Sequence, residues 1–144
     1  MRNRPVVYAL LTLLGASLAG CAAQPRRELA SLPGRDACFW TRTLFDWTVL
    51  DDSTLLVHAP TPNDAYLVKL FAPIPDLKFH DALGFQGGNG PPGQFCAQNG
   101  AVIAGGPVPE REPVIAVRAL TAAQARQLLA GAGSTKSHRM GGSS

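Results

Sequence analysis

The sequence lacks an apolar run long enough to cross a membrane as a helix. Its longest apolar stretch, residues 6–20, has 15 residues. A helix needs about 20 residues to cross the hydrocarbon core of a bilayer. This stretch is therefore too short to remain as a membrane span.

A basic stripe is also missing from the sequence. Removing Arg2 and Arg4, which lie before the apolar stretch, from the 13 basic residues leaves 11, against 10 acidic residues. A clustered excess of lysine and arginine is the electrostatic footprint of a nucleic-acid-binding protein. We therefore expect no nucleic-acid partner.

Known catalytic motifs are absent as well. The sequence has no Gly-x-Ser-x-Gly elbow, no Ser-x-x-Lys, no His-Glu-x-x-His and no phosphate-binding loop. Its three histidines are His58, His80 and His138, and only His80 adjoins a carboxylate, that of Asp81. A metal site needs three or four converging ligands. We expect no metal, no cofactor and no catalytic residue that the sequence alone would identify.

The N-terminus contains a targeting signal. Arg2 and Arg4 precede the apolar residues 6–18, and Leu18-Ala19-Gly20 leads into Cys21, so the three parts of an export signal are present. Leu18-Ala19-Gly20-Cys21 resembles the lipobox of bacterial lipoprotein precursors. The resemblance implies cleavage before Cys21 and a diacylglycerol on its sulfur, and two or three acyl chains anchor a protein stably. The alternative is an ordinary secretory signal with a cysteine by chance.

These features predict the organisation of the chain. We expect a signal peptide over residues 1–20, a tether over 21–34, one β-rich periplasmic domain over 35–131 and a disordered tail over 132–144. Ala22, rather than aspartate, follows the lipidated position, which favours the outer membrane. The protein would contact the membrane through the lipid on Cys21 and face the periplasm, with another envelope protein as its expected partner.

Two cysteines remain once Cys21 is assigned to lipid. Cys38 and Cys96 would form one pair in an oxidising compartment, so we predict a disulfide between them. The alternative is a reactive thiol or a metal site, but neither cysteine belongs to a Cys-x-x-Cys pair. In the chain-entropy model such a bridge stabilises a fold by roughly 4 kcal/mol.

The pattern of apolar and turn residues predicts a mainly β fold. We expect five to six short antiparallel strands, as a small sheet or a partly closed barrel, followed by one C-terminal helix. Asp51-Asp52-Ser53 predicts a hairpin turn and Asn99-Gly100 a second, two-residue one. A glycine-rich surface loop is expected over residues 86–93 and another loop over 105–113. The predicted strands are 43–50, 54–58, 65–71, 95–97, 101–103 and 114–119, and the predicted helix is 121–130, stopped by Gly131.

Four large rings lie within nine positions: Phe39, Trp40, Phe45 and Trp47. They cannot all occupy the inner face of one strand, because successive side chains of a strand point to opposite faces. Some of them could therefore form an exposed surface for a ligand or partner. The alternative is that they pack in the core.

Four segments carry a resemblance to a known family: Asp36-Ala37-Cys38-Phe39, residues 50–57, Tyr66-Leu67-Val68-Lys69-Leu70 and Phe95-Cys96. Together they resemble a family of small proteobacterial lipoproteins catalogued only as a domain of unknown function. The resemblance implies an envelope location and no assigned activity. We therefore expect a non-catalytic, lipid-anchored binding or structural module. The alternative is a periplasmic enzyme or enzyme inhibitor whose site, with residues such as His80 and Asp81, converges only in the fold.

Overall fold

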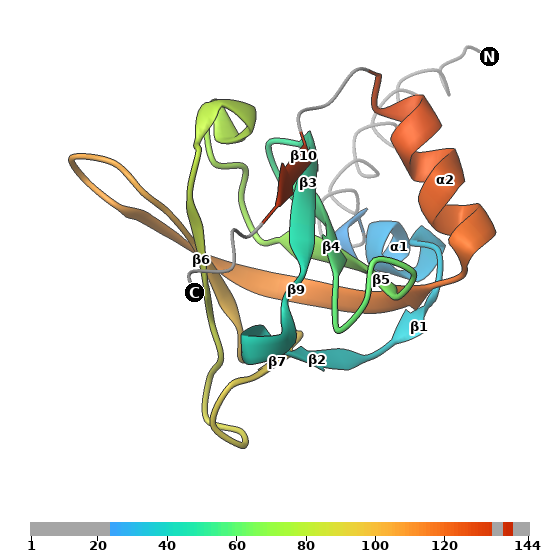
Figure 1. Cartoon of the computed structure of the whole chain (residues 1–144), viewed down its shortest axis with the longest axis horizontal. Helices are drawn as coiled ribbons and strands as arrows, with labels where there is room; N and C mark the ends of the chain where they lie inside the picture. Colours follow the sequence, from blue (N-terminus) through green and yellow to red (C-terminus); the bar gives the residue numbers. More distant parts are fainter. Residues whose placement is uncertain (1–23, 134–136, 140–144) are drawn as a thin grey trace, which may run out of the picture. The chain divides into compact units, whose positions relative to one another are not determined.

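The computed structural model describes residues 24–133 and 137–139 (Figure 1). The chain divides into two compact units between Ser31 and Leu32. Helix α1 (Gln24–Ser31) belongs to the first unit, and the sequence analysis did not predict it within the expected tether. Pro25 is compatible with α1 because the first turn of a helix needs no backbone N–H there. Among the described residues, no helix has the length and apolar character of a membrane span.

Six strands of four or more residues form the main sheet of the second unit, and each pairs antiparallel with its neighbours (Figure 1). The sheet curls into a half-barrel, and this confirms the prediction of a mainly β fold with one C-terminal helix. Two short strands extend it: β1 (Arg35–Asp36) pairs with β9, and β10 (Ser137–Arg139) pairs with β3. The spatial order of the six is β3 (Asp46–Asp51), β4 (Thr54–His58), β5 (Ala65–Leu70), β9 (Glu110–Leu120), β8 (Ala101–Ala104) and β6 (Leu83–Gln86).

Strand β9 begins earlier than the sequence predicted, because Pro113 does not interrupt it. Residues 110–113 pair with β8, and residues from Val114 onward pair with β5. Val114 N–H donates to the Gly100 carbonyl at 2.9 Å, so position 113 falls at a non-hydrogen-bonded pair on the β8 side, where a missing N–H costs no ladder bond. The predicted loop 105–113 is therefore corrected to residues 105–109.

One predicted hairpin is confirmed and the other is wrong. β3 and β4 pair across the Asp51–Ser53 turn as expected. The strands beside Asn99-Gly100 do not pair with each other: β7 (Gln94–Cys96) pairs with β2 (Cys38–Trp40), whereas β8 pairs with β6 and β9. Gln98 has φ 65°, and Gly100 N–H donates to the Cys96 carbonyl at 3.0 Å. The turn at Asn99-Gly100 therefore connects β7 of the two-stranded ribbon to β8 of the main sheet.

The core lies between the main sheet and the β2–β7 ribbon. Phe39 of β2 and Phe95 of β7 join the same buried cluster as Val57 and Val68 of the sheet. On the opposite face, Ala125 of helix α2 (Ala122–Gly131) packs with a smaller cluster that includes Leu56. The helix ends close to the predicted stop at Gly131.

The expected disordered tail is corrected in part. Residues 137–139 form β10, which extends the edge of β3 in register, with Arg139 opposite Asp46. The tail is poor in apolar residues, so its sequence gave no reason to expect a strand. The strand forms by backbone pairing with the exposed edge of the sheet, which satisfies backbone polar groups. Residues 134–136 and 140–144 lie outside the described part of the chain.

Candidate functional site

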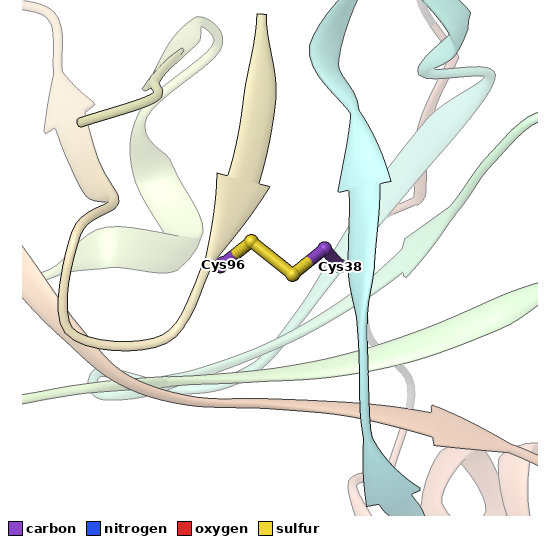
Figure 2. Close-up of a disulfide and its surroundings, with 2 residues drawn as sticks. All are labelled: Cys38 and Cys96. Atoms are coloured by element: carbon purple, nitrogen blue, oxygen red, sulfur yellow. A yellow bond between two sulfur atoms is a disulfide. The ribbon is translucent and has the colours of Figure 1, made fainter. Parts of the chain in front are cut away.

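The predicted disulfide is present and joins the two strands of the ribbon (Figure 2). Cys38 and Cys96 are directly opposite each other, with a Cα–Cα distance of 4.6 Å. The next pair along the ribbon is Phe39 with Phe95. The bridge therefore fixes the register of the two strands whose phenylalanines enter the core.

The ribbon carries its rings on alternate faces. Phe39 lies 5.0 Å from Phe95 and 5.2 Å from Tyr66 between ring centroids, within an aromatic cluster that also includes Phe85. Trp40, one residue on from Phe39, points the other way and is 38% exposed. Alternation along a strand therefore separates neighbours that the sequence grouped together.

The predicted aromatic surface needs correction at two of its four residues. Phe39 is 3% exposed and Trp47 is 2% exposed, so both belong to the core. Phe45 is half-buried. Trp40 alone remains as a substantially exposed ring of the group.

Trp40 is held in place by the segment that follows it. The Arg42 guanidinium carbon lies 5.2 Å from the centre of the Trp40 ring, a cation–π arrangement. Thr41 donates to the Gly93 carbonyl from both its backbone N–H, at 2.8 Å, and its hydroxyl, at 3.2 Å. These contacts join Trp40, Arg42 and Gly93 into one surface, here called the Trp40 surface.

The glycine-rich loop beside the Trp40 surface is closely packed against the chain. A Cβ on Gly87 would lie 2.3 Å from the Gln94 carbonyl oxygen, and a Cβ on Gly88 would lie 1.9 Å from the Asn99 carbonyl oxygen. Neither distance leaves room for a side chain. The sequence predicted a flexible surface loop here, but two of its glycines are required for close backbone approach.

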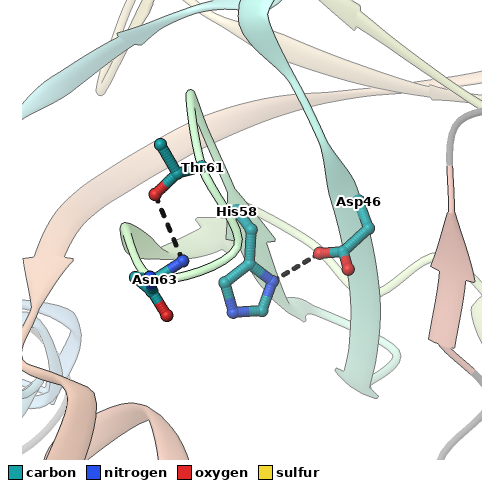
Figure 3. A network of polar contacts seen from close by, with 4 residues as sticks. All are labelled: Asp46, His58, Thr61 and Asn63. Atoms are coloured by element: carbon teal, nitrogen blue, oxygen red, sulfur yellow. Dashed lines mark hydrogen bonds and ion pairs between the residues drawn. The ribbon is translucent and has the colours of Figure 1, made fainter.

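The polar pair that the sequence analysis missed is Asp46 with His58 (Figure 3). The two residues are opposite each other in the β3–β4 hairpin, and Oδ1 of Asp46 accepts from Nδ1 of His58. Their side chains are 16% and 15% exposed. Among the described residues, Nε2 of His58 has no hydrogen-bond partner. The predicted hairpin turn was the signal that could have found this pair, because it places residues 46 and 58 close to opposite each other.

A polar turn lies beside this pair (Figure 3). The Thr61 hydroxyl donates to Asp64 Oδ2 at 2.6 Å and accepts from the Asn63 N–H at 3.3 Å. These bonds close the connection from β4 to β5. Beside this turn, the carboxylate of Asp46 accepts from Nδ1 of His58 and so orients the His58 imidazole at the end of β4. Sites in which a histidine acts as a general base have the same arrangement.

The structure does not bring His80 and Asp81 into such an arrangement. Nδ1 of His80 contacts the Gly105 carbonyl at 2.8 Å, and Asp81 is exposed. In the described ranges, no group of three or more metal-ligating side chains converges. Cys21 and the signal peptide lie outside the described residues, and the side chain of His138 is not described.

Asp51 and Lys69 form a second polar cluster around the β3–β4 turn. Asp51 accepts from the N–H and the hydroxyl of Ser53, both at 2.8 Å, and Lys69 Nζ donates to Ser53 at 2.8 Å and to Thr54 at 3.2 Å. Burial, the largest single effect, raises the pKa of Asp51, but the hydrogen bonds from Ser53 and Thr54 and the charge of Lys69 together lower it below its ordinary value. The cluster stabilises a turn, as the sequence predicted for this segment.

Comparison with protein families gives one match. The model described as "Family of unknown function (DUF6491)" matches residues 3–136. The chain belongs to this family. DUF6491 thus covers almost the whole chain, including residues 18–21, and the predicted membership of a domain-of-unknown-function family is confirmed. No curated protein and no solved structure matches the chain.

Proposed function

We propose that this member of DUF6491 is a lipid-anchored protein of the bacterial envelope, facing the periplasm from the outer membrane. The observation that carries the proposal is Leu18-Ala19-Gly20-Cys21 after a basic and apolar start. The match to the family begins at residue 3 and so includes this segment. The Cys38–Cys96 bridge supports the proposal further, because such bridges persist in oxidising compartments.

Lipidation can be tested directly on protein extracted from the membranes of its native host. The intact mass should correspond to a chain that begins at Cys21 and carries added fatty acid. A Cys21→Ser variant should keep residues 1–20 and carry no acyl mass. A wild-type chain that retains its first twenty residues, or that carries no fatty acid, would contradict the proposal.

We further propose that the protein acts as a non-catalytic binding or structural module, with the Trp40 surface as its contact. An indole with one face against a guanidinium offers a rigid, amphipathic contact of the kind enriched at binding sites. A photo-crosslinking residue at position 92, which is exposed beside Gly93 and leaves Trp40 and Arg42 in place, should give one reproducible adduct with an envelope component. The same residue at position 127, on the exposed side of α2, should not give it. Loss of the adduct in Trp40→Ala would tie it to the ring, and persistence would count against this surface.

The Asp46–His58 pair favours a second candidate function, a periplasmic enzyme that uses His58 as a general base. The carboxylate fixes Nδ1, which leaves Nε2 to accept a proton. Purified protein would be assayed against ester, phosphate and cell-wall substrates. Activity lost in both His58→Gln and Asp46→Asn, while the disulfide and fold remain, would support this candidate. Activity unchanged in both variants would exclude this pair.

A further inference from the structure

Strand β6 is an edge of the main sheet. It pairs with β8 on one side, and in the part of the chain that the structure describes no strand pairs with its other side (Figure 1). The opposite edge differs, because the short strand β10 covers part of β3. Within residues 24–133 and 137–139, the sheet therefore has one edge that a short strand extends and one edge that no strand covers.

The backbone groups that face the open side of β6 can be identified from its pairing. Gly105 N–H donates to the Ala82 carbonyl at 3.3 Å, and Leu83 pairs with Ala104 in the same register. Hydrogen-bonded and non-hydrogen-bonded pairs alternate along an antiparallel ladder. The N–H and C=O of Gly84 therefore face β8, and those of Leu83 and Phe85 face away from it.

β6 also lacks the features that usually prevent edge strands from pairing. Its sequence, Leu83-Gly84-Phe85-Gln86, contains no charge and no proline, and its pairing with β8 has no bulge. Lysine, proline and bulges are the usual protective devices at open edges. Gly84, at the centre, presents no side chain on the outer face.

We propose that β6 pairs antiparallel with β6 of a second copy of this chain, about a twofold axis through Gly84. In this register Leu83 of each copy is opposite Phe85 of the other, so four backbone hydrogen bonds satisfy every group that faces the open side. Residues opposite each other share a face of the sheet. Leu83 is buried and Phe85 packs against the core cluster, so the pairing places one apolar side chain against the other. The two Gly84 residues face each other without side chains between them.

The size of the contact determines how strong this dimer is. A pair of four-residue strands buries far less than the roughly 1,200 Å² of a stable interface. The dimer is therefore weak and depends on concentration. β6 itself carries no charge, so no like charges are opposite each other within the paired strands. Confinement to a membrane would raise the local concentration, but the pairing follows from the strand itself and does not depend on the lipid anchor.

A disulfide at the twofold axis would trap the dimer. Opposed residues at a non-hydrogen-bonded pair lie about 4.5 Å apart between Cα atoms, within the range that a disulfide spans. A Cβ at position 84 meets Ile103 at 3.4 Å, an ordinary contact. The variant Gly84→Cys would be made in the full chain with Cys21→Ser, purified in detergent and oxidised. Gln127→Cys in the same background is the control, because Gln127 is exposed on α2.

We expect Gly84→Cys to form a reducible dimer at least about tenfold faster than the control, because paired strands hold the thiols at high effective concentration. Sedimentation velocity of the wild-type chain provides a second measurement that needs no cysteine. The weight-average sedimentation coefficient should rise with protein concentration, and Gly84→Lys should abolish the rise while Gln127→Lys keeps it. Equal crosslinking rates of the two cysteine variants, or a wild-type chain that stays monomeric at every concentration, would overturn the proposal.

Discussion

At Gly88 the backbone after β6 passes so close to Asn99 that a side chain does not fit. An alanine Cβ would lie 1.9 Å from the Asn99 carbonyl oxygen, and main-chain atoms cannot move aside as a flexible side chain can. Gly90, two residues later, offers a matched control. The nearest atoms to a Cβ there are side-chain atoms of Asn99 and Gln94, at 3.4 and 3.6 Å.

We therefore expect Gly88→Ala to lower the free energy of unfolding by about 2 kcal/mol or more, as steric strain in a packed region does. Gly90→Ala should change it by no more than about 0.5 kcal/mol, the usual range for open surface positions. Urea denaturation followed by circular dichroism measures both. Similar small effects for the two variants would show that the loop does not hold Gly88 against Asn99.

Asp51 makes a pH-dependent contribution to stability. Its pKa is lowered in the folded protein, so the folded state binds its proton less tightly than the unfolded state does. The contribution is present above the ordinary value of 3.8 and is lost as the pH falls through the lower pKa of the folded state.

Unfolding measured between pH 7 and pH 2 should therefore show a smaller acid-induced loss of stability in Asp51→Asn than in wild type. Ser53→Ala should reduce the same loss, because it removes a hydroxyl that donates to the ionised carboxylate. The double variant should add little to either single one. Equal acid dependence in wild type and Asp51→Asn would contradict the assignment.

Among the elements, the β2–β7 ribbon depends most on its covalent link. Each of its strands has only three residues, and an isolated short pair of strands is marginal in water. Cys38 and Cys96 are separated by 58 positions, so the bridge restricts the unfolded chain strongly. It also holds Phe39 and Phe95 together in the core.

Replacing both cysteines by alanine should lower the free energy of unfolding by up to about 4 kcal/mol, the value that the chain-entropy model gives for a loop of this length. Wild-type protein treated with a reductant should approach the stability of the double variant. The reductant should leave the double variant itself unchanged. A loss below about 1 kcal/mol would mean that core packing alone maintains the ribbon, in contrast to the usual effect of a native bridge.

The elements also show where sequence patterns were sufficient. The β3–β4 turn and strand β5 follow local rules, because Asp51-Asp52-Ser53 forms its own hydrogen bonds and the apolar residues of β5 pack on the core. The disulfide followed from counting cysteines. These features depend on residues close in sequence or on a single long-range constraint.

Long-range pairing could not be predicted in the same way. Asn99-Gly100 marked a turn correctly, but no local pattern shows that β7 pairs with β2 across more than fifty residues. The same limit explains why the sequence left the burial of Phe39 and Trp47 open, because their burial depends on which face of each strand meets the core. The Asp46–His58 pair is an intermediate case, because the predicted Asp51–Ser53 turn already brings residues 46 and 58 close to opposite each other, and the structure adds that their side chains meet.

At the scale of the whole molecule, the chain divides between Ser31 and Leu32 into two compact units. The described strands, the disulfide and helix α2 all belong to the unit Leu32–Ser144. Residues 21–31 would connect this unit to the lipid under the proposed function. Stability and membrane attachment should therefore be separable by removing the first 31 residues.

A chain that starts at Leu32, exported by a heterologous secretory signal, tests this separation. We expect it to form the Cys38–Cys96 disulfide and to unfold in one cooperative transition, with a Tm within about 3 °C of the full protein, a shift that for a domain of this size corresponds to less than 1 kcal/mol. It should appear in the soluble periplasmic fraction, whereas under the proposed function the full chain should be found with the membranes. A Tm lowered by 10 °C or more would show that residues before Leu32 are part of the folding unit. Membrane association of the truncated chain would instead place a membrane-binding surface on the β-rich unit itself.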